Sequence, residues 1–357
     1  MLFGDAKKFV GPSCVNSPAT VAALSFQRGS DSETGADSGM IQDVPQPNGN
    51  CMQIREPESA QMRSRITIAF GFACLLTAWM IASATPASAQ APAPLSVKPL
   101  SGGVYYAAGG DGGNTGIIIG KDGVIVVDAK TTAASAKEVL AEIAKLSPKP
   151  VTTVILSHSD ADHVNGLAGF PKGLTIIAQE TCKKEMEESL KGPQPAPRDY
   201  LPTHTVKMKE STTIDGVPVQ LLHWAPAHTG GDLITYLPDQ KIVFAGDILI
   251  QQMPFTLIHA EKNGTSAGWV ETVKGMLALN ADTFIPGHGD AMTRADVQKK
   301  LAAVEKRRAD IKALVAQGKS LDEIKKALND TEKPIVLPNG ISFPTFTDVV
   351  YKEDTKK

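Results

Sequence analysis

Short apolar runs that are rich in β-branched residues recur along residues 96–290, and turn residues separate them. Runs of this kind are typical of β-strands. The pattern predicts two sets of strands, the first at 103–108, 115–119, 124–128, 152–156 and 174–178, the second at 205–208, 217–222, 233–237, 241–245 and 283–285. The pairs Asp122-Gly123, Asp215-Gly216 and Pro238-Asp239 stand where hairpin turns are expected.

Apolar residues at helical spacing predict helices between and after these strands. One apolar stripe runs through 136–146, and further helices are expected at 180–190, 266–277 and 301–315. Ser320 and Glu323 form the capping box of a shorter helix. Because the strands fall into two sets with helices between them, we expect two sheets packed face to face and flanked by helices. No composition break follows residue 96, so residues 103–357 are expected to form one domain, preceded by a linker at 90–102.

The segment 62–89 has the pattern of a secretory signal peptide. Arg63 and Arg65 precede an apolar run from Ile66 onward, and the segment ends in Ala87-Ser88-Ala89. The alternative is a short transmembrane anchor, because the run approaches spanning length. We expect cleavage near Ala89, which predicts a periplasmic or secreted protein without stable membrane association.

Residues 1–61 are rich in Ser, Gly, Asp and Pro and lack hydrophobic periodicity, so we expect them to be disordered. Since a signal peptide normally stands at the start of a protein, we expect translation to begin at Met62, with 1–61 a mis-assigned extension. If Met1 is the true start, the apolar run becomes an internal signal-anchor.

Composition narrows the class of partner. The chain is 42% hydrophobic and 21% charged with a net charge of −2, which is typical of a globular protein and gives no electrostatic basis for binding nucleic acid. A small-molecule substrate is expected instead. The four cysteines form no C-x-x-C pair, which excludes a zinc ribbon, and a mature chain would keep only Cys182.

The strand predicted at 152–156 is followed at once by His158, Asp160, Asp162 and His163. Imidazole and carboxylate are the ligands that zinc and related first-row metals prefer. A turn at a strand end can direct several short side chains to one point. The alternative for this segment alone is a solvated loop that happens to contain His and Asp.

Three later fragments carry further candidate ligands at strand boundaries. His228 lies in a loop between two predicted strands, Asp247 ends an apolar strand, and His288 follows another strand between glycines. Functional groups collect in such loops at the edge of a sheet. Four fragments of this kind in one chain favour a metal site.

Together these motifs resemble the metallo-β-lactamase superfamily, whose pattern is H-x-H-x-D-H, a separate His, an Asp at a strand end and a final His in a P-G-H-G-like turn. The resemblance covers about 103–290. It implies an α+β fold, an αββα sandwich of two mixed β-sheets flanked by helices. It also implies a site for one or two metal ions, with His158 and His228 on the first ion, Asp162, His163 and His288 on the second, and Asp247 between them. Asp128, after an early strand, would support the ligand loop without binding metal.

The chain departs from the family at Asp160, where a histidine is usual. An extra carboxylate is expected to make the ions weaker Lewis acids and to favour iron or manganese relative to zinc. We therefore expect one or two zinc ions, with iron or manganese as the alternatives. A further possibility is that Asp160 is too short to reach, so that only the ion at Asp162, His163 and His288 binds firmly.

The resemblance implies hydrolysis of an ester, lactone, thioester or amide bond, a β-lactam included, by metal-bound hydroxide. Asp162 would be the catalytic residue that orients the hydroxide and moves its proton, and His259 is a weaker candidate for a substrate contact. The glycine-rich segment 109–116 is expected to be a turn or flap over the site. The alternatives are an iron-dependent redox enzyme of the same fold and a non-catalytic metal-binding protein.

Overall fold

The computed structural model describes residues 93–193, 195–337 and 340–355. The predicted extension at 1–61 and the predicted signal peptide at 62–89 lie outside these residues. Within the part of the chain that is described, no helix is long and apolar enough to cross a membrane.

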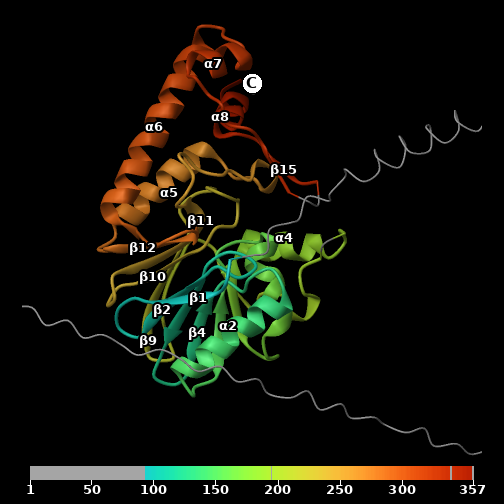
Figure 1. Ribbon diagram of the computed structural model, residues 1–357, viewed down its shortest axis with the longest axis vertical. Coiled ribbons are helices and arrows are strands. Elements are labelled where there is room, and N and C mark those ends of the chain that lie inside the picture. The colour runs from blue at the N-terminus through green and yellow to red at the C-terminus, as the bar shows by residue number, and fades with distance from the viewer. Residues whose placement is uncertain (1–92, 194, 338–339, 356–357) are drawn as a thin grey trace, which may run out of the picture. The chain divides into compact units, whose positions relative to one another are not determined.

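Two mixed β-sheets pack face to face, with helices on both outer faces (Figure 1), so the predicted αββα sandwich is confirmed. The first sheet contains, in order, β1 (Ser96–Pro99), β2 (Val104–Ala108), β3 (Thr115–Ile119), β4 (Val124–Val127), β5 (Val151–Ile155), β6 (Thr175–Gln179) and β7 (His204–Val206). The second contains β13 (Met292–Thr293), β12 (Thr283–His288), β11 (Ile242–Ile250), β10 (Ile234–Leu237), β9 (Val217–Leu222) and β8 (Lys209–Ile214). Strands β4 to β7 are parallel neighbours, and in the second sheet β11 and β12 are parallel.

The longer helices cover the two outer faces (Figure 1). The first sheet carries α2 (Ala133–Leu146) and α4 (Glu180–Ser189), and the second carries α5 (Ser266–Ala278), α6 (Arg294–Ala316), α7 (Leu321–Ala327) and α8 (Phe346–Thr355). The short elements are α3 (Ala161–Val164), η1 (Asn165–Gly169), η2 (Arg198–Tyr200), η3 (Ala260–Lys262) and the small hairpin of β14 (Ile335–Val336) and β15 (Ser342–Phe343). The capping box predicted for Ser320 and Glu323 begins α7.

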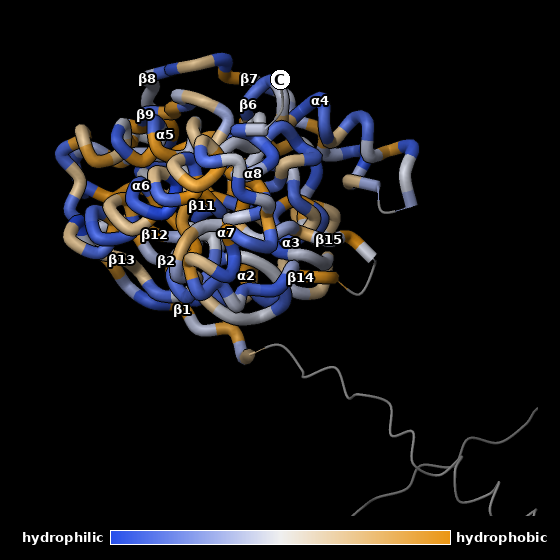
Figure 2. Tube along the Cα trace, turned by 90° about the horizontal axis from the view of Figure 1, so that it is seen from above, coloured by the Kyte–Doolittle hydropathy of each residue, from blue (hydrophilic) through white to orange (hydrophobic). Residues whose placement is uncertain are grey.

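Three apolar clusters hold these four layers together, one at each boundary. Ile125 and Ile155 of the first sheet pack with Phe244 of the second in the central cluster. Val139 of α2 packs on the outer face of the first sheet, and Trp269 of α5 on that of the second. Figure 2 shows the apolar strand β11 near the middle of the tube and the largely polar α4 at its edge. Burial of these faces is the main stabilising term for the sandwich.

The structure differs from the sequence prediction mainly at the edges of the sheets. The expected linker at 90–102 contains β1, whose Val97 pairs with Ala107 of β2. Strand β8 was not predicted, because its mostly polar residues alternate between exposed and half-buried positions at the open edge of the second sheet. Strand β11 does not end at Asp247 but continues to Ile250, with register shifts around Gly246.

Candidate metal centre

Seven potential metal ligands from distant parts of the chain converge beside the ends of the central strands. Both sheets contribute: the segment after β5 and the short helix α3 supply four of the side chains, and the loop before β10, strand β11 and the end of β12 supply the others. The seven are His158, Asp160, Asp162, His163, His228, Asp247 and His288, and their donor atoms form three overlapping groups within which no two atoms are more than 4.8 Å apart. These are the seven residues that the sequence proposed as ligands.

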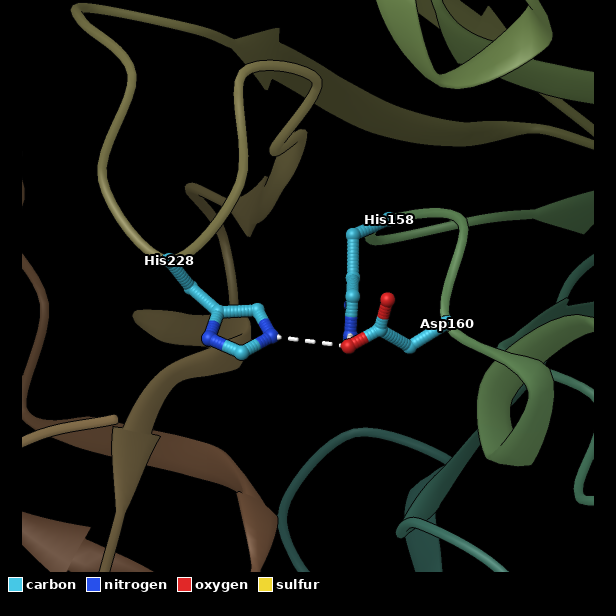
Figure 3. Close-up of side chains that lie close together, drawn as sticks. All are labelled: His158, Asp160 and His228. Carbon is cyan, nitrogen blue, oxygen red and sulfur yellow. Dashed lines mark hydrogen bonds and ion pairs between the residues drawn. The ribbon is translucent and has the colours of Figure 1, made fainter. Parts of the chain in front are cut away.

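His158, Asp160 and His228 form what we call the first donor set (Figure 3). His228 extends from its loop toward the two residues that follow β5. Asp160 Oδ2 lies 3.1 Å from His228 Nε2 and 3.7 Å from His158 Nε2. The carboxylate of Asp160 is therefore long enough to reach the donor atoms of this set.

Asp162, His163 and His288 form the second donor set. Asp162 Oδ2 lies 3.1 Å from His288 Nε2 and 3.5 Å from His163 Nε2. The side chains of Asp162 and His288 are 35% and 34% exposed, whereas His163 is fully buried. The second set is thus open to solvent on one side.

Asp247 lies between the two sets. Its Oδ1 is 3.2 Å from His163 Nε2 of the second set, and its Oδ2 is 4.0 Å from His228 Nε2 of the first. The irregular register at Gly246, which has a φ of +53°, turns Asp247 toward the site without ending the strand. A side chain at Gly246 would also meet Ser157 at about 2.5 Å, so both conformation and space require glycine there.

The three buried histidines of the donor sets are oriented by hydrogen bonds at their Nδ1 atoms. His158 Nδ1 bonds Ser157 Oγ at 2.9 Å, His163 Nδ1 bonds Asp128 Oδ2 at 2.9 Å, and His228 Nδ1 bonds the Leu257 carbonyl at 3.0 Å. A carbonyl can only accept, so His228 Nδ1 carries the proton and its Nε2 is free to donate a lone pair when the ring is neutral. This arrangement is the one that metal-binding histidines require.

Asp128 connects the two sets through its hydrogen bonds to Ser157 and His163. Its carboxylate accepts the backbone N–H and the hydroxyl of Ser157, both at 2.7 Å, in addition to the bond from His163. Its backbone has a φ of +64°, which aspartate tolerates better than most residues. Asp128 therefore supports the site through three hydrogen bonds and is not itself one of the potential ligands.

The carboxylates make the site electronegative, so positive charge is stabilised there, as the pKa values of the histidines show. Burial opposes protonation of His228, but the adjoining Asp160 raises its pKa to about 9, and Asp247 raises that of His288 to about 10. Burial acts to raise the pKa of Asp247, yet the neighbouring histidines hold it well below the usual range. A cluster of three carboxylates and four imidazoles suits divalent cations.

Three buried polar atoms test whether the site fits metal ions. Among the described residues, eight buried side-chain atoms make no hydrogen bond, and three of these belong to the donor groups: His158 Nε2, His163 Nε2 and Asp247 Oδ1. Leaving a buried polar atom unsatisfied costs about 1–3 kcal/mol. Because all three atoms belong to the donor groups, binding of metal ions would satisfy them, and the residues present fit such ions.

His259 contacts Asp160, and its ring lies beside that of His228, with centroids 6.1 Å apart. Its Nδ1 is 3.0 Å from Asp160 Oδ1, and its ring meets that of Phe343 edge-on, with centroids 4.8 Å apart. The side chain is 9% exposed. His259 thus supports a donor, and its direct contact with substrate stays a prediction.

Two lysines beside the site were not found from the sequence. Lys130 is buried, and its ammonium bonds the carbonyls of Ala107, Gly109 and Gly113, which fixes the glycine-rich loop at 109–116. Lys262 donates to Asp160 Oδ1 at 2.7 Å. Neither lysine belongs to a sequence motif, so its position beside the site is seen only in the tertiary structure.

Two other histidines, His204 and His223, lie outside the donor groups. His204 is partly exposed and pairs with Glu210 at 2.8 Å, while His223 Nδ1 bonds the carbonyl of Asp232.

Comparison with known proteins agrees with this geometry. The sequence model of the family described as the Metallo-beta-lactamase superfamily matches residues 108–288, half of the chain, and this stretch contains all seven candidate ligands.

Individual relatives are more distant. The linear primary-alkylsulfatase of Pseudomonas sp. (strain ATCC 19151) is 26% identical over 217 residues, which are 48% of this chain and 40% of that protein. The 2,4-dinitroanisole O-demethylase subunit alpha of Nocardioides sp. (strain JS1661) is 26% identical over 207 residues, 57% of this chain and 60% of that protein. The chain therefore spans less than two thirds of the length of either relative. The structure of the stereoselective inverting sec-alkylsulfatase from Pseudomonas sp. superposes with a TM-score of 0.56 at 18% identity, over 73% of this chain and 50% of that one, and shows the same fold.

Proposed function

The chain belongs to the metallo-beta-lactamase superfamily, and from that premise we propose that it is a hydrolase of small molecules that depends on two metal ions. The observation that carries the proposal is the set of three buried donor atoms without a hydrogen bond, at the meeting point of seven potential ligands. Structural carboxylates and histidines are normally satisfied by protein partners. Zinc is the proposed ion, because imidazole and carboxylate are its usual ligands together with sulfur.

Each residue of the site has a proposed part in this reaction. The first donor set would hold one ion and the second donor set the other, with Asp247 as a shared ligand between the two sets. Such ions lower the pKa of bound water and polarise the bond that is cleaved. We assign to Asp162, which is partly exposed beside His288, the role of orienting the attacking water and accepting its proton. The substrate would approach from this open side.

The proposed substrates contain an ester, lactone, thioester or amide bond, β-lactams included. The similarity to a linear primary-alkylsulfatase adds sulfate esters to the bonds that need testing. All of these bonds share an electrophilic centre bonded to oxygen, and a water activated in the site attacks that centre in each case.

Metal analysis and a substrate panel test the proposal together. Protein purified without added metal is expected to contain two ions per chain. Turnover is measured on a panel of an aryl ester, a lactone, a thioester, a β-lactam and an alkyl sulfate. A chelator is expected to abolish turnover of at least one of these substrates, and added zinc is expected to restore it. His288→Ala removes a proposed ligand and should lose one ion, whereas His204→Ala is the matched control and should keep both. Full turnover of metal-free protein, or no bound metal, would refute the function.

Asp160 also supports a second candidate, an iron-dependent redox enzyme of the same fold. A carboxylate in the first donor set suits harder ions such as iron better than a third imidazole would. The same metal analysis separates the candidates, because stoichiometric iron with oxygen-dependent turnover would favour the redox enzyme over the hydrolase.

We further propose that the protein is exported, with cleavage of the signal peptide near Ala89. N-terminal sequencing of protein recovered from the periplasm or medium tests this. A mature start near Gln90 is expected, and an intact start at Met1 or Met62 would contradict export by cleavage.

A further inference from the structure

The carboxylate of Asp160 is divided between two groups of partners. Its Oδ2 faces the histidines of the first donor set, 3.1 Å from His228 Nε2, while its Oδ1 accepts Lys262 Nζ at 2.7 Å. His259 Nδ1 lies near both oxygens, 3.0 Å from Oδ1 and 3.1 Å from Oδ2. Asp160 stands at the N-cap of α3, where an aspartate normally accepts a backbone N–H, yet it makes no such bond. Its side chain is therefore committed to the site and to Lys262 and takes no part in capping the helix.

Lys262 is a fixed partner and not a mobile surface charge. Its ammonium also donates to the carbonyl and hydroxyl of Ser159, at 3.1 and 2.8 Å, so its three protons have three acceptors. Its carbonyl accepts Gly230 N–H at 2.6 Å, which ties it to the loop that carries His228. The side chains of Lys262 and Asp160 are 27% and 11% exposed, so their pairing is only partly screened by water.

We propose that Lys262 is a positioning residue for Asp160, which restrains Oδ1, presents Oδ2 alone to the first ion and offsets the charge of the carboxylate. This inference rests on the proposed function, since it takes Asp160 as a ligand. The site contains three negative charges, those of Asp160, Asp162 and Asp247. The ammonium of Lys262 adds one positive charge beside Asp160. The weakening of Lewis acidity expected from the extra carboxylate is thereby reduced, because the Asp160–Lys262 pair is neutral as an imidazole is.

Glu185 is the other carboxylate that faces this ammonium, and it provides a control. It accepts the hydroxyl of Ser159 at 2.5 Å and reaches Lys262 only through that residue. Burial raises the pKa of Glu185. Replacing Glu185 by Gln removes a nearby carboxyl without touching Asp160, so it separates a general change of charge from the specific pair.

The test is a double-mutant cycle with metal binding as the readout. Zinc affinity of the first site is measured by chelator competition for wild type, Asp160→His, Lys262→Met and the double variant. Asp160→His alone is expected to bind the first ion at least about tenfold more weakly, because an uncompensated ammonium then faces the ion. Adding Lys262→Met is expected to restore the affinity.

Cobalt substitution reports the positioning directly. In Lys262→Met, Oδ1 loses its ammonium partner and keeps only the contact with His259 Nδ1 at 3.0 Å, so the carboxylate is less restrained and Oδ1 can also turn toward the ion. The visible absorption of the cobalt protein should then weaken as the coordination number rises, whereas Lys262→Arg and Glu185→Gln should keep the wild-type spectrum and affinity. Thermal melting of the metal-free variants checks that each is folded.

The outcomes separate the two proposals. Wild type without bound metal would refute the proposed function. Metal-replete wild type whose Asp160→His variant binds as tightly as wild type, with an unchanged cobalt spectrum in Lys262→Met, would overturn the role of Lys262 alone.

Discussion

The two donor sets are built from the same residue types but differ in exposure and in support. In the first set His158 and His228 are at most 1% exposed, and Lys262 and His259 hold Asp160 from behind. In the second set two of the three side chains are about one third exposed. The comparison shows that one site combines a donor set enclosed by protein with a second donor set that is open to solvent, where substrate and water could arrive.

Support for the second set comes from a different part of the chain. Asp128 orients His163, and the glycine-rich loop packs directly against that ring, with Gly113 N–H donating to the Asp162 carbonyl at 3.1 Å. Lys130 fixes the loop through three carbonyls. The first set is thus supported by an ion pair at Asp160, and the second by Asp128 and the packed glycine-rich loop, so different substitutions are expected to affect the two sets.

The largest effect is expected from His163→Ala, which removes a ligand of the second set and leaves the first intact. One ion should be lost, and kcat/KM should fall by about a thousandfold or more, because the ion nearest the open side is missing. Metal content and turnover of the variant check this. Retention of both ions at full turnover would show that the open set is not a metal site.

Asp128→Asn tests whether one carboxylate supports both sets. Asparagine tolerates the positive φ of this position, so the variant mainly removes a charge and an acceptor. Affinity for the second ion should fall about tenfold to a hundredfold, the usual result of losing a residue that orients a ligand.

Ser157→Ala is the companion variant. The hydroxyl of Ser157 is bonded both to Asp128 and to His158, so it links Asp128 to the first donor set and makes no hydrogen bond to the histidines of the second. The variant should affect the first ion more than the second. Equal losses at both sites in both variants would remove the distinction between the two sets.

Gly113→Ala probes the packing that supports the second set. A Cβ atom there would lie 2.3 Å from Cε1 of His163, so either the ring or the loop must move. We expect a loss of about 1–3 kcal/mol in the free energy of unfolding and weaker binding of the second ion only. Gly192→Ala is the matched control, because its nearest atom is 3.3 Å away on an exposed turn. Denaturant titration and zinc competition measure both quantities, and an unaltered Gly113→Ala protein would contradict the close packing.

The smallest effect is expected for His204→Ala. His204 is 45% exposed and forms only a surface ion pair with Glu210, so the free energy of unfolding should change by less than about 0.5 kcal/mol. Metal content and turnover should stay at the wild-type level. Loss of an ion in this variant would mean that the donor sets extend beyond the seven residues.

Much of the sandwich could be predicted because its strands carry their own signal. The runs at 115–119 and 217–222 were predicted with the observed bounds, since apolar β-branched residues and turns at Asp122-Gly123 and Asp215-Gly216 define them locally. Strand β8 could not be predicted in the same way, because it is stabilised by pairing with β9 and not by a buried face of its own.

For the site, the sequence by itself determined which side chains are candidates, because clustered His and Asp after apolar strands have no simpler use in a core. It could not determine how they are held. That Asp247 lies within a strand and still faces the donors depends on the register between β11 and β12, which joins residues about 40 positions apart. That Lys262 meets Asp160 depends on a loop 102 residues further along the chain. Such pairings are decided only when the layers pack, because a lone lysine carries no local pattern and its partner is chosen by the tertiary fold.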